Sequence, residues 1–283
     1  MSEAPREILR RHGLRPKKDW GQNFLGDEQV LSDIAAACSV GEGDVVVELG
    51  AGLGHLTRAL AETHAQIVAV ERDRDLVRVL EKELALPNVK VIAANAADLD
   101  FEQVAQAPRP VVAGNLPYQL SSPILFQLLE QRTRVRRAVF LLQKEVAQRI
   151  SAPPGGRDYG LLSVLLQAFA HVGIVFEVSA HYFHPPPKVD SAVVRIDLLE
   201  KPRADVRDQA RFTKVVKAAF ALRRKTLSNA LKAARLVDDA GLAAALARAN
   251  IDGQRRAETL SPQEFAALER ELPVAPAKPD RTR

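Results

Sequence analysis

Four consecutive residues, Asn115-Leu116-Pro117-Tyr118, carry groups that could prepare an aromatic amine for reaction. The lone pair of such an amine is delocalised into its ring, so the nitrogen is a poor nucleophile until acceptors hold its N–H groups out of the ring plane. The side-chain oxygen of Asn115 and the backbone carbonyl of Leu116 could be these acceptors, and Pro117 would fix the loop before the base arrives. The ring of Tyr118 could stack on the base, a contact of about 1–3 kcal/mol. The target base would have to be unpaired or flipped out of a duplex. The tetrapeptide alone is equally compatible with a proline turn that carries a surface tyrosine.

A strand and a helix should position this tetrapeptide. The apolar residues 111–113 and Gly114 predict the end of a buried strand, and Ser122-Pro123 is a favourable helix start, because serine caps free N–H groups and proline suits the first helical position. The loop between them should therefore lie at the carboxyl edge of a sheet, where open α/β sheets bind ligands.

A glycine-rich loop earlier in the chain also follows directly after an expected strand. The β-branched run 44–49 ends in Gly50-Ala51-Gly52-Leu53-Gly54, and glycines let a backbone approach a ligand closely. Glu71 ends the next expected strand, where an acid can accept hydrogen bonds from ribose hydroxyls. The two features indicate an adenosine-containing cofactor. A nicotinamide fingerprint would need glycine where His55 stands, and the spacing instead resembles motif I of S-adenosylmethionine-dependent methyltransferases.

Strands and helices alternate along the first two thirds of the chain. This pattern predicts an α/β fold with a mostly parallel, doubly wound sheet, a Rossmann-like class I methyltransferase sheet, ending in two late antiparallel strands at 172–178 and 192–198. After Glu200 only helices are expected, which predicts a smaller carboxyl-terminal all-α domain. The expected division is a basic arm over 1–20, a catalytic domain over 21–199, a helical domain over 200–272 and a disordered tail over 273–283.

Charge and composition narrow the classes of partner. The chain carries a net charge of +5, and Lys201 to Arg235 alone holds eleven Lys or Arg against two Asp. This concentration favours a nucleic-acid partner over a merely solvated helix face. Cys38 is the only cysteine, which excludes a disulfide framework and fits a reducing compartment such as the cytoplasm. We expect no metal site, and no apolar run is long enough to cross a bilayer.

Five motifs in order along the chain resemble the ribosomal RNA adenine N6,N6-dimethyltransferases, and within them the enzymes that dimethylate two adjacent adenines near the 3′ end of small-subunit (16S) RNA. The resemblance runs from about Arg15 to Leu231. The matching motifs are Gly21-Gln22-Asn23-Phe24-Leu25, the glycine loop with Glu48 and Glu71, Asn115 to Tyr118, Phe183 to Ser191, and Phe220 to Leu227.

The resemblance implies a role for individual residues. S-adenosylmethionine would be the cofactor, and the catalytic motif would place Phe183 as a second stacking face opposite Tyr118. The residues that would bind the cofactor are Asn23, Leu25, Gly50, Gly52, Glu71, Asn95 and Asn115, those that would act on the base are Asn115, Leu116, Pro117, Tyr118 and Phe183, and those that would bind RNA are Arg223, Arg224 and Lys225. Phe183 could instead be a core residue, and the three basic residues a solvated helix end.

Two residues depart from the family pattern. Asn95 stands where the family usually has an acid after the third strand, and Asp98 could replace it if the loop is shifted; Trp20 stands where a smaller residue is more common. The expected partner is small-subunit ribosomal RNA, or the immature small subunit during its biogenesis, bound by a cytoplasmic monomer. A large-subunit adenine dimethylase of the macrolide-resistance type and a non-catalytic assembly or transcription factor remain alternatives.

Overall fold

The computed structural model describes residues 3–222 and 224–273 and divides the chain into two compact units. The first unit comprises Met1–Gln148 and Ala170–Glu200, and the second comprises Arg149–Phe169 and Lys201–Arg283. The segment Arg149–Phe169 thus belongs with the carboxyl-terminal helices, although the sequence assigned it to the catalytic domain. Its apolar helix packs against those later helices, which explains the difference.

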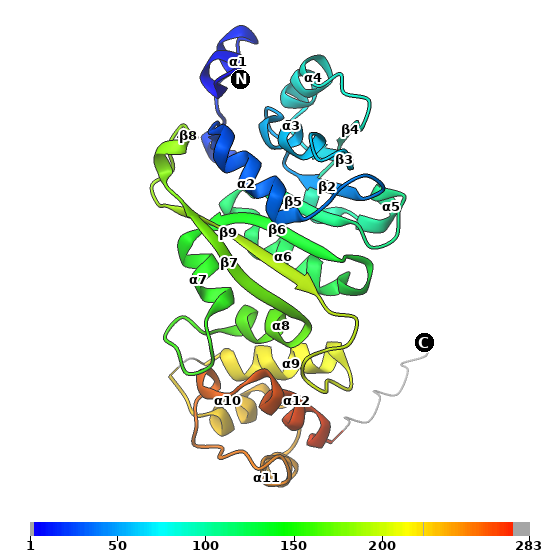
Figure 1. Cartoon of the computed structure of the whole chain (residues 1–283). Helices are drawn as coiled ribbons and strands as arrows, with labels where there is room; N and C mark the ends of the chain where they lie inside the picture. The colour runs from blue at the N-terminus through cyan, green and yellow to red at the C-terminus, as the bar shows by residue number, and fades with distance from the viewer. Residues whose placement is uncertain (1–2, 223, 274–283) are drawn as a thin grey trace, which may run out of the picture. The chain divides into compact units, whose positions relative to one another are not determined.

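A seven-stranded sheet forms the centre of the first unit (Figure 1), in the order β4-β3-β2-β5-β6-β9-β7. The first five strands in this order are parallel, and β9 pairs antiparallel with both β6 and β7. Their bounds are β2 (Val45–Leu49), β3 (Gln66–Glu71), β4 (Val89–Ala93), β5 (Val111–Asn115), β6 (Arg137–Gln143), β7 (Ala170–Val178) and β9 (Ser191–Leu198). This sheet, with the helical second unit, confirms the predicted fold class.

Helices cover both faces of the sheet and pack apolar side chains against it. A cluster joins Leu31 and Ile34 of α2 (Glu28–Cys38), and Leu56 and Leu60 of α3 (His55–Ala61), to strand residues such as Val46. In Figure 1, α2 and α6 (Ser121–Glu130) lie on opposite sides of the sheet. The first unit also contains α4 (Arg74–Glu83), α5 (Phe101–Ala105), the first part of α7 (Lys144–Ser151) and a helix near the amino terminus. Single turns of 3-10 helix occur at Lys18–Trp20, Ala96–Asp98, Tyr118–Leu120, Arg132–Arg134 and Ala180–Tyr182.

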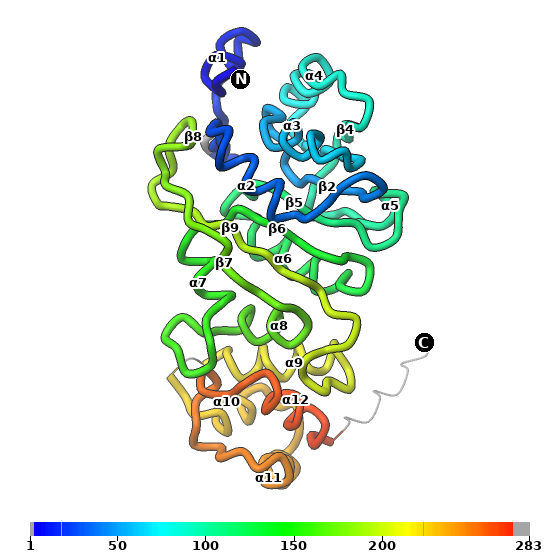
Figure 2. The backbone as a smooth tube through the Cα atoms, viewed as in Figure 1, coloured from blue at the N-terminus to red at the C-terminus, as the bar shows by residue number. Residues whose placement is uncertain are grey.

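The amino-terminal segment contains two elements that the sequence did not predict. Within the expected basic arm, α1 (Pro5–Arg11) buries Ile8 and Leu9 in a cluster with Phe24 and Leu53. Next, β1 (Phe24–Leu25) pairs with β8 (Phe183–His184), so that residues far apart in the chain lie side by side (Figure 2). This two-residue ladder ties the Gly21–Leu25 motif to the loop that follows β7.

The second unit is helical. It contains α8 (Leu161–Phe169), α9 (Gln209–Phe220), α10 (Leu227–Ala234), α11 (Asp239–Arg248) and α12 (Pro262–Glu271), with a 3-10 turn at Ala257–Thr259. Phe169 at the end of α8 packs edge-on against Phe212 of α9, with ring centroids 5.8 Å apart. Ser261 and Glu264 form a capping box at the start of α12. The side chains of α8 therefore complete the core of this unit.

Neither a membrane-spanning helix nor a metal centre is present in the part of the chain that the structure describes. No helix there has the length and hydrophobicity needed to cross a bilayer. No three His, Cys, Asp or Glu side chains gather there in a way that could hold a metal ion. Of the expected disordered tail, residues 274–283 lie outside the described residues.

Candidate active site

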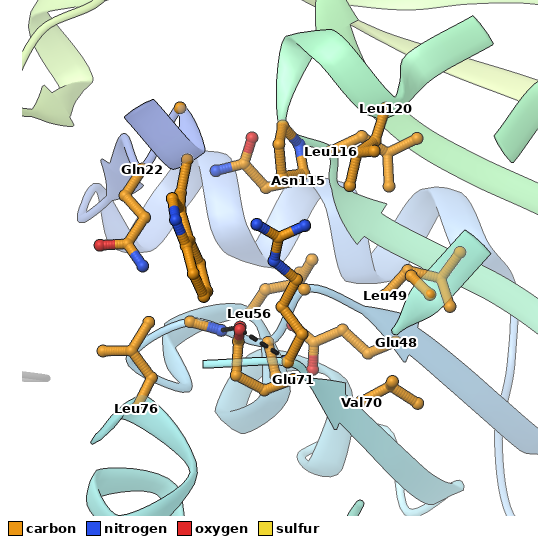
Figure 3. Close-up of a pocket in the computed structure, with 18 of the residues that line it drawn as sticks. Gln22, Glu48, Leu49, Leu56, Val70, Glu71, Leu76, Asn115, Leu116 and Leu120 are labelled. Atoms are coloured by element: carbon orange, nitrogen blue, oxygen red, sulfur yellow. Dashed lines mark hydrogen bonds between the residues drawn. The ribbon is translucent and has the colours of Figure 1, made fainter. Parts of the chain in front are cut away.

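One cavity lies at the carboxyl ends of β2, β3, β4 and β5, and it collects most of the residues that the sequence singled out. Ten of them line it: Asn23, Leu25, Gly50, Gly52, Glu71, Asn95, Asn115, Leu116, Pro117 and Tyr118. In Figure 3, Asn115 and Leu116 lie across the cavity from Glu48 and Glu71. Every residue of this wall belongs to the first unit.

The glycine loop has a backbone that only glycine adopts without strain. Gly50, Gly52 and Gly54 all have positive φ, at 74°, 59° and 83°. A Cβ on Gly52 would lie 3.3 Å from the ring of Phe24, and one on Gly54 would lie 2.5 Å from a methyl group of Leu84. The loop is therefore packed closely on both sides and leaves its backbone facing the cavity.

Glu71 fixes this loop from the neighbouring strand. Its Oε2 accepts a hydrogen bond of 2.9 Å from the N–H of Gly52, and its Oε1 accepts from the N–H groups of Arg72 and Asp73 at 2.8 and 2.9 Å. Burial raises the pKa of Glu71, although the three N–H donors oppose that rise. The carboxylate is thus a fixed acceptor at the end of β3, and Oε2, which accepts only one of the three bonds, has a lone pair left for a ligand hydroxyl.

Glu48 also lines the cavity, a residue of the glycine-loop motif for which the sequence indicated no role of its own. It is 1% exposed, and its Oε2 has no hydrogen-bond partner among the described residues. Burial, with a smaller contribution from the charge of Glu71, raises the pKa of Glu48 to about 8. At neutral pH Glu48 is therefore largely protonated and can donate a hydrogen bond. The signal available in the sequence was a charged residue within an otherwise apolar strand.

Asn115 ends β5 and is held in place from the amino-terminal motif. Its Nδ2 donates a hydrogen bond of 3.0 Å to the backbone carbonyl of Asn23. Because the nitrogen is the donor in this bond, the side-chain oxygen is the acceptor that Asn115 can offer a ligand. Gly114 brings the strand end close to the glycine loop, since a Cβ there would lie 2.5 Å from the carbonyl oxygen of Leu49. The local fold thus sets the orientation of the amide.

The two aromatic residues of the expected sandwich have different surroundings. Tyr118 lines the cavity, and its hydroxyl lies 3.1 Å from Oγ of Ser191; burial raises its pKa. Phe183 is 5% exposed and packs in an apolar cluster with Leu25 and Val193, because β8 pairs with β1. The structure does not place the ring of Phe183 on the cavity wall, and its position agrees with the core alternative.

Asn95 and Asp98, which the sequence could not separate, act as a pair. Asn95 lines the cavity and Asp98 is not among the lining residues. The Nδ2 of Asn95 donates a hydrogen bond of 2.6 Å to Asp98, and its Oδ1 accepts a longer one of 3.4 Å from the N–H of Ala97. Asp98 therefore orients the amide, and Asn95 presents it to the cavity.

The expected RNA-binding residues lie in the second unit, between α9 and α10. Arg224 and Lys225 are exposed there, whereas Arg223 lies outside the described residues. Thr226 caps α10 directly after them, and the half-buried ring of Phe220 before them packs against Tyr159 and Phe265. Arg224 and Lys225 therefore lie on a short connection that is held at one end by the packing of Phe220 and at the other by the cap of Thr226.

The sheet order, the glycine loop and the strand-end acid together define a class I S-adenosylmethionine-dependent methyltransferase. Comparison with known proteins then places the chain within that class. Residues 13–273 match the model of the ribosomal RNA adenine dimethylase family, so the chain belongs to this family. Its cofactor is S-adenosylmethionine, the methyl donor of the family's reaction, and the resemblance predicted from the motifs is confirmed.

Individual relatives agree with this assignment. The chain is 60% identical over 277 residues to a protein of Myxococcus xanthus named ribosomal RNA small subunit methyltransferase A, covering 97% of this chain and 98% of the relative. A protein of the same name from Geobacter sulfurreducens is 47% identical, with 94% and 99% covered.

Two solved structures share the fold over most of the chain. A dimethyladenosine transferase from Plasmodium falciparum has a TM-score of 0.75 at 25% identity, covering 87% of this chain and 95% of that one. The 23S rRNA methyltransferase ErmE has a TM-score of 0.68 at 27% identity, with 88% and 99% covered. The fold alone therefore does not identify which ribosomal RNA is the target.

Proposed function

We propose that this chain transfers methyl groups from S-adenosylmethionine to the N6 nitrogens of two adjacent adenines near the 3′ end of small-subunit (16S) ribosomal RNA. The observation that carries the proposal is the bond between Asn115 and Asn23 in the same cavity wall as Gly50 and Glu71. It sets an amide acceptor beside a cavity whose other groups suit an adenosine ligand.

The cavity residues fit the cofactor chemically. Glu71 offers the remaining lone pair of Oε2 to a ribose hydroxyl, and Gly50 and Gly52 offer a backbone without side chains against which a ligand can lie. Oε2 of Glu48 is buried and has no hydrogen-bond partner within the described part of the chain, so it is a polar group of the cavity that a ligand could contact. Asn23, Leu25 and Asn95 complete the proposed cofactor wall. When bound, the cofactor supplies an electrophilic methyl group on its sulfonium.

The catalytic residues hold the base rather than exchange protons with it. Asn115 through its side-chain oxygen and Leu116 through its carbonyl accept hydrogen bonds from the N–H groups of the adenine, which frees the nitrogen lone pair for attack. The methylated nitrogen is acidic and releases one proton to solvent, so no strong base is needed. Pro117 keeps this loop in one geometry, and Tyr118 stacks on the base. Phe183, the first residue of β8, is proposed as the second stacking face, which requires its ring to turn toward the cavity when RNA binds.

Exposed cations select and hold the RNA. Arg224 and Lys225, with Arg223, would neutralise phosphates in a segment that is rich in positive charge. The substrate would be the immature small subunit, which gives the reaction a place in ribosome biogenesis. The cytoplasm is the proposed site of action. We propose a monomer, since one chain supplies every residue of the cavity wall.

The target RNA is supported by the names of the relatives. Proteins at 60% and 47% identity are named as small-subunit methyltransferases, whereas the likeness to the 23S enzyme is at 27% identity. The likeness in fold to that enzyme makes the large-subunit reaction the second candidate, and a binding module without catalysis is the third.

One experiment tests all three. The chain is incubated with tritiated S-adenosylmethionine and either immature small subunits or large-subunit RNA, and the labelled RNA is digested to nucleosides. We expect label in N6,N6-dimethyladenosine from small subunits only, with a reverse-transcriptase stop at two adjacent adenines. Label in large-subunit RNA alone would establish the second candidate, and RNA binding without label in either would establish the third.

A further inference from the structure

Trp20 stands at the rim of the cavity with a guanidinium group against it. Trp20 and Arg72 both line the cavity, and Cζ of Arg72 lies 4.0 Å from the centroid of the indole ring. The tryptophan is 36% exposed, so a large aromatic ring is left open to solvent at this rim. A guanidinium at this distance is attracted to the ring face and can stack flat on it. The pair belongs to the cavity, yet the proposed reaction gives it no role.

A hydrogen-bond network holds this pair together from both sides. Nζ of Lys17 lies 2.7 Å from Asp73 and 2.9 Å from Asp75, at the start of α4. Gln22 donates to Asp73 at 2.9 Å and accepts from the backbone N–H of Lys17 at 2.8 Å. The segment that carries Trp20 is therefore tied at both ends to the residue that follows Arg72, and these bonds keep the ring and the guanidinium together.

The position of Arg72 in the chain locates the ligand group that it can meet. Arg72 directly follows Glu71, the proposed ribose acceptor, and Asn95 follows the neighbouring strand on the same wall. A base whose ribose is bound by Glu71 would come close to Arg72, the next residue of the chain and part of the same cavity wall. A planar guanidinium has two faces, and Trp20 covers one, which leaves the other for a flat ring.

We propose that Trp20 and Arg72 form a stacked clamp for the adenine of the cofactor, with the guanidinium between the indole and the adenine. The inference rests on the proposed cofactor site. Arg72 touches the cofactor, and Trp20 is a positioning residue that acts through Arg72. Because stacking needs a plane and not only a charge, lysine cannot replace Arg72 in this arrangement.

Intrinsic fluorescence provides a direct test, because Trp20 is the only tryptophan of the chain. S-adenosylhomocysteine and adenosine, which contain adenine, should change the Trp20 emission in a saturable way, and methionine, which lacks it, should not. Calorimetry on the same samples gives affinity independently of the fluorescence.

Matched variants separate the effect of a planar stacking group from the effect of a positive charge. We expect Trp20→Leu, Arg72→Gln and Arg72→Lys each to weaken S-adenosylhomocysteine binding about five- to tenfold. Trp20→Phe should retain most of the affinity, because its ring can still stack. Lys82→Arg is the control, since Lys82 is an exposed residue of α4 outside both the cavity and the Lys17–Asp73–Asp75 network, and this variant should bind as the wild type does. Thermal melting shows whether each variant is folded. In the variants that weaken binding, KM for S-adenosylmethionine should rise while kcat at saturating S-adenosylmethionine is unchanged.

The outcomes distinguish this inference from the proposed function. The clamp is overturned, and the methyltransferase function stands, if three results coincide. Calorimetry detects binding of S-adenosylhomocysteine to the wild type, this binding does not change Trp20 emission, and Trp20→Leu and Arg72→Lys keep the wild-type affinity. A response to methionine alone also overturns it. If the wild-type chain binds no S-adenosylhomocysteine at all, the proposed function fails, and the clamp fails with it.

Discussion

Nδ2 of Asn115 donates a hydrogen bond of 3.0 Å to the backbone carbonyl of Asn23, 92 residues earlier in the chain. This bond decides which end of the amide is left for a ligand, because a nitrogen engaged as a donor leaves the oxygen as the free acceptor. In the proposed mechanism, the amino-terminal motif would thus contribute to catalysis by orienting a side chain on β5.

Replacing Asn115 tests whether this oxygen carries the reaction. Asn115→Ala should lower kcat for methyl transfer by about a hundredfold or more, because the acceptor placed where charge develops is removed. S-adenosylhomocysteine affinity should fall far less than kcat, although Asn115 also borders the proposed cofactor site. Asn115→Asp keeps the oxygen but lacks the donor to Asn23, so it should be intermediate. Single-turnover transfer and calorimetry provide the measurements, and an Ala variant with normal turnover would remove Asn115 from the mechanism.

Substitutions at the two aromatic residues separate stacking from packing. Tyr118→Phe removes only the hydrogen bond with Ser191 and should retain turnover within a few-fold, whereas Tyr118→Ala should reduce it more than tenfold because about 1–3 kcal/mol of stacking disappears. Phe183→Leu keeps apolar bulk, so stability should fall by less than about 1.5 kcal/mol. If Phe183 also stacks on the base, kcat of this variant should fall by at least about tenfold. A Leu variant with full activity would confine Phe183 to the core.

The Asn95–Asp98 bond predicts a compensated pair. Asn95→Asp alone brings two carboxylates together where a 2.6 Å hydrogen bond now stands, so cofactor affinity should drop about tenfold or more. Adding Asp98→Asn restores a donor–acceptor pair and should recover the affinity. A double-mutant cycle by calorimetry measures the coupling. Additive effects of the two changes would show that the residues act independently.

The raised pKa of Glu48 predicts that the free energy of unfolding decreases as pH rises. The folded chain has a Glu48 pKa of about 8 against an ordinary value of 4.5, so between these pH values it holds a proton that the unfolded chain releases. Stability should therefore fall as pH rises through this range, by at most about 1.4 kcal/mol per pH unit. Glu48→Gln should melt with a flatter pH profile and exceed the wild type above pH 8. If the stability of the wild type and of Glu48→Gln changed with pH in parallel, the raised pKa of Glu48 would be contradicted.

The exposed cations of the second unit predict a change in salt dependence. Replacing Arg224 and Lys225 by Gln should weaken binding to small-subunit RNA and reduce the slope of log affinity against log salt by about 0.7–0.9 for each phosphate that is no longer neutralised. Filter binding over a range of KCl concentrations measures both effects. Methylation of a saturating substrate should persist, and an unchanged slope would assign RNA binding elsewhere.

The sequence was most informative where local chemistry leaves a pattern. The glycine loop, Glu71 and Asn115 each lie at the end of a strand, and the carboxyl ends of adjacent parallel strands converge on one edge, so their meeting could be predicted. Pairings between distant residues leave no such pattern. The two-residue ladder of β1 and β8, the bond from Asn95 to Asp98 and the burial of Phe183 depend on tertiary packing. Likewise, α1 was hidden in a basic stretch in which few apolar residues, among them Ile8 and Leu9, mark its buried face.

The division of the chain into units has a practical consequence for protein engineering. Because Arg149–Phe169 interrupts the first unit and completes the second, neither unit is encoded by one continuous stretch. A chain truncated after Glu200 would expose the apolar side of α8, whose Phe169 would no longer have Phe212 as its neighbour. Exchanging the helical unit between relatives, or expressing it alone, therefore requires two grafted segments and a designed junction rather than a simple truncation.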